Sequence, residues 1–187
     1  MAESSGQVKW ANPGALGLMC FGMNTMLLQI HNLGLITGDI PIIYAFFWGG
    51  LAQVICGIID ARRGDTFGFT AFTAYGAFWI GLAFLYMNGY VAKDPSGVAW
   101  AMLFWGLFTF YMSFGAWKTS VVHAIVFISL TILFWLLTAV FFKVLPAPVA
   151  GWVGLICGGT AVYGSAAIIL NDKFGRWVLP MGFPKSK

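Results

Sequence analysis

Uncharged polar side chains recur within otherwise apolar stretches of the sequence. Thr70 and Thr73 have the three-residue spacing that places two side chains on one face of a helix. A single Thr hydroxyl usually bonds to its own helix backbone. Polar groups in every apolar stretch, however, favour a narrow path that hydrogen-bonds a small solute without fixing a charge. The full set is Asn24, Thr25, Gln29, Gln53, Thr70, Thr73, Thr109, Ser113, Ser129, Thr131, Thr138, Thr160, Tyr163 and Ser165.

Motifs for covalent or metal chemistry are absent from the sequence. It contains no HExxH zinc motif, no nucleophile elbow and no pair of carboxylates within an apolar stretch. Cys20, Cys56 and Cys157 are far apart inside apolar stretches, which indicates small buried thiols and neither a disulfide framework nor a zinc site. We therefore expect no enzyme activity, no cofactor and no metal ion.

The composition is that of a membrane protein. The chain has 187 residues, of which 60% are hydrophobic and 9% charged, and its mean hydropathy is +0.85. Soluble domains carry roughly 25% charged residues, so a soluble enzyme, a secreted disulfide-rich domain and a disordered chain are excluded. The net charge of +4 comes from single or paired basic residues. Such a scattered charge does not indicate a nucleic-acid partner.

Six apolar stretches have the length of membrane-spanning helices, which is about 20 residues. They cover residues 14–30, 40–59, 67–87, 98–117, 121–145 and 149–170, and Lys143 is expected in the last turn of the fifth. We expect an all-α integral membrane protein with six transmembrane helices in each protomer. Its parts would be a cytoplasmic segment 1–13, a transmembrane domain 14–170 and a cytoplasmic tail 171–187.

No Asp, Glu or Arg falls within these stretches. Asp60 and Asp65 flank Arg62 and Arg63 in the connection 60–66, which is typical of a charged cap on the cytoplasmic side. Both histidines lie at the ends of stretches. Because proton-driven carriers often use a membrane-buried acid or histidine as a relay, the pattern predicts no such relay. Passive and proton-coupled mechanisms both remain open.

The basic residues predict the orientation, because cytoplasmic loops of membrane proteins are enriched in Lys and Arg. With a cytoplasmic N-terminus, eight of them fall inside and only Lys93 and Lys143 fall outside. We therefore expect both termini in the cytoplasm of a cell whose cytoplasmic (inner) membrane holds the protein. The eight are Lys9, Arg62, Arg63, Lys118, Lys173, Arg176, Lys185 and Lys187.

The first stretch begins with a helix-start signal. Asn is a favoured N-cap and Pro is favoured at the first helical position, so Asn12 and Pro13 predict a helix start. A helix N-terminus also suits an anion, and a plain cap and an anion contact explain the pair equally well. Within the last stretch, Gly154 and Gly158 form a GxxxG pattern, which indicates close helix packing in a bundle or an oligomer.

Several separated blocks resemble one known family. Residues 12–21, NPGALGLMCF, resemble the NPAPLGL-type signature of the acetate uptake transporters, also called the succinate–acetate permease family. Residues 64–79, GDTFGFTAFTAYGAFW, are similar to the family pattern G-x-T-F-G-x-T-A-F-x-x-Y-G-x-F-W. Residues 151–158, GWVGLICG, match as well. The resemblance spans nearly the whole chain, with the blocks in the family's order.

The resemblance implies a hexamer of six-helix protomers, each with its own pathway for acetate and related small carboxylates such as succinate. A hydrophobic constriction in that pathway would be formed by Phe21, Tyr75 and Leu130. The conserved Asn and Gln of the family would be Asn12 and Gln53. The chain departs from the signature at residue 15, where Ala replaces the second proline.

Helical periodicity is compatible with this assignment. Thr25 shares a helix face with Phe21, and Trp79 shares one with Tyr75. Hydroxyls near aromatic rings would bind a carboxylate weakly enough for its release. The candidate substrate-binding residues are Asn12, Gln53, Thr25, Thr70, Thr73 and Trp79.

The sequence therefore predicts transport of acetate and similar carboxylates across the bilayer, by a channel-like mechanism or together with protons. Two alternatives remain. One is a channel for small neutral solutes such as urea or ammonia, and the other is a membrane-embedded binding or sensory subunit that transports nothing.

Overall fold

The computed structural model describes residues 10–182, and the regular secondary structure in this range is entirely helical. Lys9, Lys185 and Lys187, together with most of the predicted segment 1–13, lie outside the described residues. The elements are α1 (Gly14–Asn32), α2 (Ile40–Tyr44), the π-helix η1 (Ala45–Ala52), α3 (Gln53–Arg63), α4 (Thr66–Met87), α5 (Tyr90–Lys93), α6 (Pro95–Thr119), α7 (Val121–Phe141) and α8 (Ala147–Phe174).

Within residues 10–182, five helical segments are long and apolar enough to cross a membrane, which confirms a multi-pass, all-helical architecture. They are Ile40–Arg63, which joins α2, η1 and α3, then Thr66–Met87, Pro95–Thr119, Val121–Phe141 and Ala147–Phe174. The helix α1 has 19 residues but is not among them. Its polar residues Asn24, Gln29 and His31 lower its hydropathy, so the first of the six predicted spans is a long helix of more polar composition.

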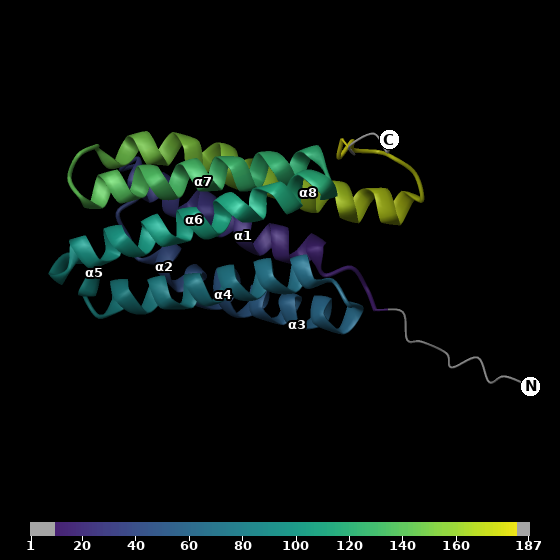
Figure 1. Cartoon of the computed structure of the whole chain (residues 1–187), viewed down its shortest axis with the longest axis horizontal. Coiled ribbons are helices and arrows are strands. Elements are labelled where there is room, and N and C mark those ends of the chain that lie inside the picture. Colours follow the sequence, from purple (N-terminus) through teal and green to yellow (C-terminus); the bar gives the residue numbers. More distant parts are fainter. Residues whose placement is uncertain (1–9, 183–187) are drawn as a thin grey trace, which may run out of the picture.

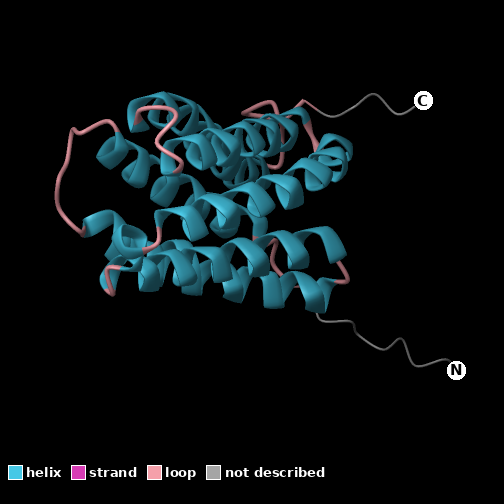
Figure 2. Cartoon of the chain, turned by 60° about the vertical axis from the view of Figure 1, so that its left-hand side comes forward, coloured by secondary structure: helices cyan, strands magenta, loops and turns pink. Residues whose placement is uncertain are grey.

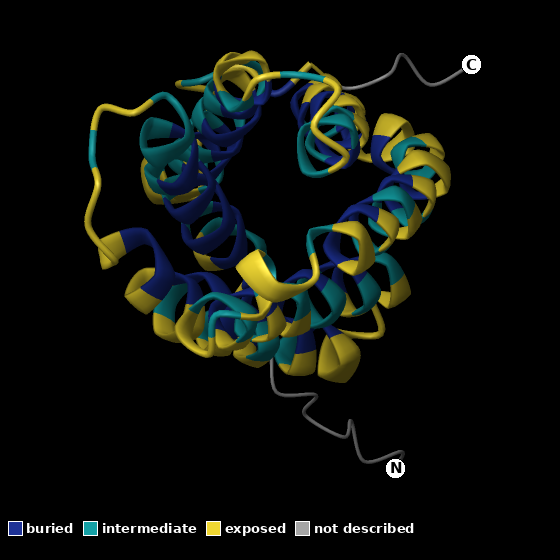
Figure 3. Cartoon of the chain, turned by 90° about the vertical axis from the view of Figure 1, so that its left-hand side faces the viewer, coloured by how far each residue is buried: buried dark blue, intermediate teal, exposed yellow. Residues whose placement is uncertain are grey.

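The long helices run side by side and surround a common axis. The start of α1 and the C-terminal segment after α8 lie at one end of the bundle, and α5 lies at the other (Figure 1). Short loops join the helices (Figure 2). Viewed along the axis, buried residues face inward and exposed residues face outward (Figure 3). The helix α1 packs on α8, α8 on α7 and α7 on α6, while α3 and η1 pack on α4 and α1.

Several helix ends differ from the predicted ones. The second span continues through Asp60 to Arg63, where Gly64 ends it in the left-handed conformation. The predicted position of Lys143 in the last turn of the fifth span is wrong, because α7 ends at Phe141 and Lys143 has φ 61° in the following turn. The last helix, α8, continues to Phe174 and so includes the start of the predicted tail.

The predicted start of α1 is confirmed. The Gly14 N–H donates to Asn12 Oδ1 at 2.9 Å, and the Gly17 N–H donates to the Pro13 carbonyl at 2.9 Å. The Asn12 side chain thus satisfies one of the free N–H groups of the first turn. A hydrogen bond from Arg63 Nη1 to Asn12 Oδ1, at 3.3 Å, places Asn12 beside the end of α3.

Candidate functional site

Two cavities lie along the axis of the bundle, one toward each end. Cavity A has a volume of about 210 Å³ and opens near the start of α1, the end of α3 and the start of α7. Cavity B has a volume of about 220 Å³ and lies toward the α5 end. Each is large enough for a small organic acid with a few water molecules, since water occupies about 30 Å³ in the liquid.

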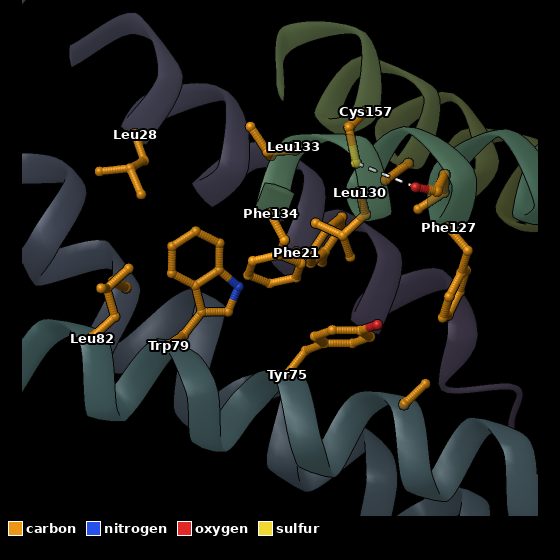
Figure 4. Packing of buried hydrophobic residues seen from close by; sticks show 14 of the residues in the cluster. Phe21, Leu28, Tyr75, Trp79, Leu82, Phe127, Leu130, Leu133, Phe134 and Cys157 are labelled. Carbon is orange, nitrogen blue, oxygen red and sulfur yellow. Dashed lines mark hydrogen bonds between the residues drawn. The ribbon is translucent and has the colours of Figure 1, made fainter. Parts of the chain in front are cut away.

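Two side chains line both cavities, and a third completes the boundary between them. Phe21 from α1 and Leu130 from α7 border cavity A and cavity B, while Tyr75 from α4 borders cavity A. The centroids of the Phe21 and Tyr75 rings are 5.9 Å apart, and all three side chains are at most 5% exposed. Figure 4 shows them pointing into the space between α1, α4 and α7. We call this group the Phe21–Tyr75–Leu130 boundary.

The Tyr75 hydroxyl is held by α6. Its Oη lies 2.9 Å from Thr109 Oγ1, and the Thr109 hydroxyl itself donates to the Trp105 carbonyl at 2.7 Å. The Tyr75 O–H is therefore the donor to Thr109. Thr109 was noted from the sequence only as one polar residue among many, and its role as the partner of Tyr75 depends on the packing of α4 beside α6.

Cavity B contains buried polar groups among apolar side chains. Thr25 Oγ1 and Trp79 Nε1 are both buried and have no hydrogen-bond partner among residues 10–182. Gln29 Oε1 accepts a hydrogen bond from Asn32 Nδ2 at 2.9 Å, and both residues line the same cavity. Because a buried donor without a partner is unfavourable, the Thr25 hydroxyl and the Trp79 indole N–H are suited to a solute that brings acceptor oxygens.

Cavity A has a more polar and charged lining. Asn12, Gln53, Asp60, Arg63 and His123 all border it. Gln53 Oε1 is buried without a hydrogen-bond partner in the described part of the chain. The predicted residues Asn12 and Gln53 therefore lie in one cavity, and Thr25 and Trp79 in the other.

Thr70 and Thr73 are not brought to either cavity. Neither residue borders cavity A or cavity B. Thr73 packs against Gly57 of α3, where an added Cβ would collide with its hydroxyl and its backbone nitrogen. The three-residue spacing correctly relates the two side chains, but the face that they share does not line the cavities.

Asp60 corrects the expectation that no carboxylate is buried. It lies within α3, is 2% exposed and borders cavity A. Its Oδ1 accepts a hydrogen bond from Arg63 Nη1 at 2.8 Å. The two residues form an ion pair and are three positions apart on the same helix. The signal was available in the sequence, because Gln53, Cys56 and Gly57 precede Asp60 at helical same-face spacing. Extending the second span by one turn would have identified it.

The described part of the chain contains no cluster of metal-ligating side chains. No group of three or more His, Cys, Asp or Glu side chains is close enough there to hold an ion. Cys20, Cys56 and Cys157 are free and buried, as predicted. What the arrangement offers instead is a row of hydrogen-bonding groups on both sides of an apolar boundary.

Comparisons with known proteins agree with the motifs. The family model described as the GPR1/FUN34/yaaH family matches residues 2–184. The chain is 44% identical over 184 residues to the succinate-acetate/proton symporter SatP of Escherichia coli (strain K12), which covers 95% of this chain and 98% of the relative. It is 31% identical over 193 residues to ammonia transport outward protein 2 of Saccharomyces cerevisiae, covering 95% of this chain and 68% of the relative.

A solved structure shares the fold. The structure of the bacterial acetate channel SatP matches with a TM-score of 0.88 and 41% sequence identity, over 93% of this chain and 100% of the other. The relatives are thus named as a transporter and a channel, and the family suggested by residues 12–21 and 64–79 is confirmed. On the match over residues 2–184 and this shared fold, the chain belongs to the GPR1/FUN34/yaaH family.

Proposed function

We propose that this protein carries acetate and related small carboxylates such as succinate across the cytoplasmic membrane. The solute passes through cavity A, the Phe21–Tyr75–Leu130 boundary and cavity B within one protomer. The observation that carries the proposal is the meeting of two cavities at Phe21 and Leu130. The names of the bacterial relative and of the matching structure supply the substrate class.

Each part of the pathway has its own task in this mechanism. Asn12 and Gln53 contact the solute in cavity A, and Thr25 and Trp79 donate hydrogen bonds to its carboxylate in cavity B. The boundary excludes larger solutes, because its two rings and one Leu side chain are closely packed. In cavity B, weak hydrogen bonds in place of a fixed positive charge allow release, as conduction requires.

The orientation and assembly complete the proposal. Arg62, Arg63 and Lys118 lie at the end of the bundle that holds cavity A, so we place that end and both termini in the cytoplasm. We count α1 as a further span, because it packs between α8 and the span that joins α2, η1 and α3, and so completes the ring of helices. Large apolar side chains cover the outer surface, and we assign them to contacts with lipid and with neighbouring protomers of a hexamer.

Replacement of Leu130 tests the boundary. Leu130→Ala removes three carbon atoms from it, so uptake of lactate into proteoliposomes is expected to rise by about tenfold relative to acetate, the scale at which one or two methylene groups discriminate between solutes. Leu136→Ala is the matched control, since Leu136 is on the same helix but borders neither cavity. An unchanged lactate-to-acetate ratio in Leu130→Ala would remove Leu130 from the pathway.

The transport activity itself is tested with labelled acetate. Proteoliposomes containing the wild-type protein are expected to exchange labelled for unlabelled acetate faster than protein-free liposomes. Imposing a pH gradient, acidic outside, measures the coupling to protons: net uptake above that of equally acidified empty liposomes indicates symport. Saturable acetate binding without exchange would instead identify a binding or sensory subunit.

A second candidate function is the passage of ammonia. It is favoured by the name of the yeast relative, ammonia transport outward protein 2, and by the uncharged lining of cavity B. Competition separates the two candidates. Inhibition of labelled acetate exchange by formate but not by ammonium at equal concentration supports the carboxylate, and the opposite pattern supports ammonia.

A further inference from the structure

We propose that the Asp60–Arg63 pair couples the binding of one carboxylate in cavity A to the uptake of one proton. This inference rests on the proposed function and adds a residue pair to it. It requires a buried acid, a cation that the substrate can reach, and a reason why the acid and the substrate cannot both keep a negative charge at that cation.

The acid is Asp60. Its side chain is buried in α3, and its only hydrogen bond among the described residues joins Oδ1 to Arg63 Nη1 at 2.8 Å. The second oxygen, Oδ2, lies against the first turn of α4, where Gly68 has no side chain and an added Cβ would collide with it. Asp60 also borders cavity A. A solute in that cavity therefore meets a carboxylate whose charge is balanced by one arginine.

The cation is Arg63. Among residues 10–182 it is the one Lys or Arg side chain that borders cavity A, and 31% of its side chain is exposed. Besides Asp60, its Nη1 donates to Asn12 Oδ1 at 3.3 Å. A guanidinium has five N–H donors, so Arg63 retains donors for a second carboxylate. The bidentate geometry of arginine suits that ligand.

The other ionisable groups near Asp60 come from three places. Asp65, in the turn before α4, repels Asp60 electrostatically, and its Oδ1 accepts a hydrogen bond from the Gly68 N–H at 2.9 Å. Cys56 lies one turn earlier on α3 and interacts electrostatically with Asp60. His123 of α7 borders the same cavity and lies 2.7 Å from Ser120 Oγ through its Nδ1. Asn12, which precedes α1, is uncharged.

These positions make carboxylate binding and protonation of Asp60 interdependent. A substrate carboxylate that binds Arg63 competes with Asp60 for the same guanidinium, and a buried carboxylate without its ion-pair partner is unfavourable. The conflict is removed when Asp60 takes a proton from water. One O–H bond forms on Asp60, the acetate replaces it as the partner of Arg63, and the net charge of the cavity is unchanged. One acetate and one proton therefore enter together.

Calorimetry of acetate binding measures this proton directly. Titrations near neutral pH, where free acetate is ionised, are carried out on the full-length protein in detergent in buffers of different ionisation enthalpy. We expect wild type to take up about one proton per acetate bound, and its acetate affinity to fall about tenfold for each unit rise in pH. In Asp60→Asn, which keeps an acceptor oxygen for Arg63, we expect proton uptake close to zero and an affinity independent of pH.

Two further aspartate variants make the result specific. Asp94→Asn, in the exposed turn before α6 and outside both cavities, is expected to retain the proton uptake of wild type. Asp65→Asn is expected to retain it also. If Asp60→Asn keeps about one proton per acetate, the acid itself carries the proton and the inference is wrong. If Asp65→Asn loses it, the wrong aspartate has been chosen.

The arginine provides an independent measurement that does not depend on the folding of Asp60→Asn. In Arg63→Gln we expect acetate affinity to fall by about tenfold or more, the loss of a charge-assisted hydrogen bond. Arg62→Gln is the matched control, because Arg62 is exposed and borders neither cavity A nor cavity B. Equal affinities in the two variants would overturn the role of Arg63. A wild-type protein that neither binds nor exchanges acetate would instead reject the proposed function, which separates the two failures.

Discussion

The helix α1 meets α8 through glycines, whereas α4 meets α6 through aromatic rings. At the first contact, a Cβ added to Gly158 would lie 2.7 Å from the Gly22 carbonyl oxygen, so the two backbones touch. At the second, the backbones do not pack closely, and side chains fill the space between them. The Phe78 and Trp105 ring centroids are 5.1 Å apart there.

The difference locates the rigid and the adjustable walls of the pathway. Phe21 precedes Gly22 on the glycine contact, where any shift of α1 would push backbone atoms into α8. Tyr75 belongs to the aromatic contact, with Trp105 and Phe108 at ring-centroid distances of 5.9 and 5.5 Å. Rings change position by rotation about side-chain bonds at modest cost. We therefore expect the boundary to widen on the Tyr75 side, while Phe21 stays in place.

The largest effect on stability is expected when a methyl group is added to a glycine at the contact between α1 and α8. Gly158→Ala places its Cβ against the Gly22 carbonyl and the backbone nitrogen of Met26, and should lower the free energy of unfolding by about 2 kcal/mol, as overpacking does. The thermal midpoint of the detergent-solubilised protein, followed by tryptophan fluorescence, measures the change.

The adjacent glycine is the control for this substitution. A Cβ on Gly159 meets no atom within 4 Å, so Gly159→Ala should raise stability by up to about 1 kcal/mol through the helix propensity of alanine. Changes of the same sign in both variants would show that the contact between α1 and α8 does not depend on Gly158.

A smaller effect is expected on the aromatic contact. Tyr75→Phe removes the hydrogen bond to Thr109 at 2.9 Å but keeps the ring, and Thr109 retains its bond to the Trp105 carbonyl. The expected loss of stability is about 1 kcal/mol. The exposed Tyr111 makes no hydrogen bond through its hydroxyl to any of residues 10–182, so Tyr111→Phe should leave the thermal midpoint unchanged. A loss for Tyr75→Phe as large as that for Gly158→Ala would contradict the contrast between the two contacts.

The smallest effect on stability is expected at the start of α6. Asp94 accepts hydrogen bonds from the Gly97 N–H and from Ser96 Oγ, both at 2.9 Å, and these lower the pKa of its carboxyl below the ordinary value of 3.8. Because the folded state favours the charged form, the stabilisation is present above pH 3.8 and is lost as the pH falls through the lower folded pKa. Asp94→Asn should therefore be slightly less stable than wild type at neutral pH, with the difference vanishing in acid. Thermal midpoints measured across this pH range give the comparison.

Much of the fold was predictable because its signals are local. Apolar runs of the right length, Asn12 and Pro13 at a helix start, and Gly154 and Gly158 on one helix each act through neighbouring residues. The end of the second span was missed because charged residues were taken to end the helix, although Gly64 is the residue that ends it. Because this last turn was left out of the predicted span, the burial of Asp60 was not predicted.

The cavity residues were less predictable, since spacing relates side chains only within one helix. The same spacing rule placed Thr25 on one helix face with Phe21, and Thr73 on one face with Thr70. In the structure, however, Thr25 borders cavity B and Thr73 packs on α3. Which face turns inward depends on the neighbours of each helix. For Phe21, Tyr75 and Leu130 the family resemblance supplied the grouping, because no local pattern connects residues so far apart in the chain.

The sequence by itself determined that this chain crosses a membrane as helices. In hydrocarbon every backbone N–H and C=O must find its partner within the chain, and a long apolar segment satisfies this requirement as a helix. Only the tertiary structure decided that Phe21 and Leu130 separate two cavities and that Asp60 pairs with Arg63 inside one of them. Those relations exist because α1, α3, α4 and α7 are packed around one axis, at distances that glycine contacts set on one side and aromatic rings on the other.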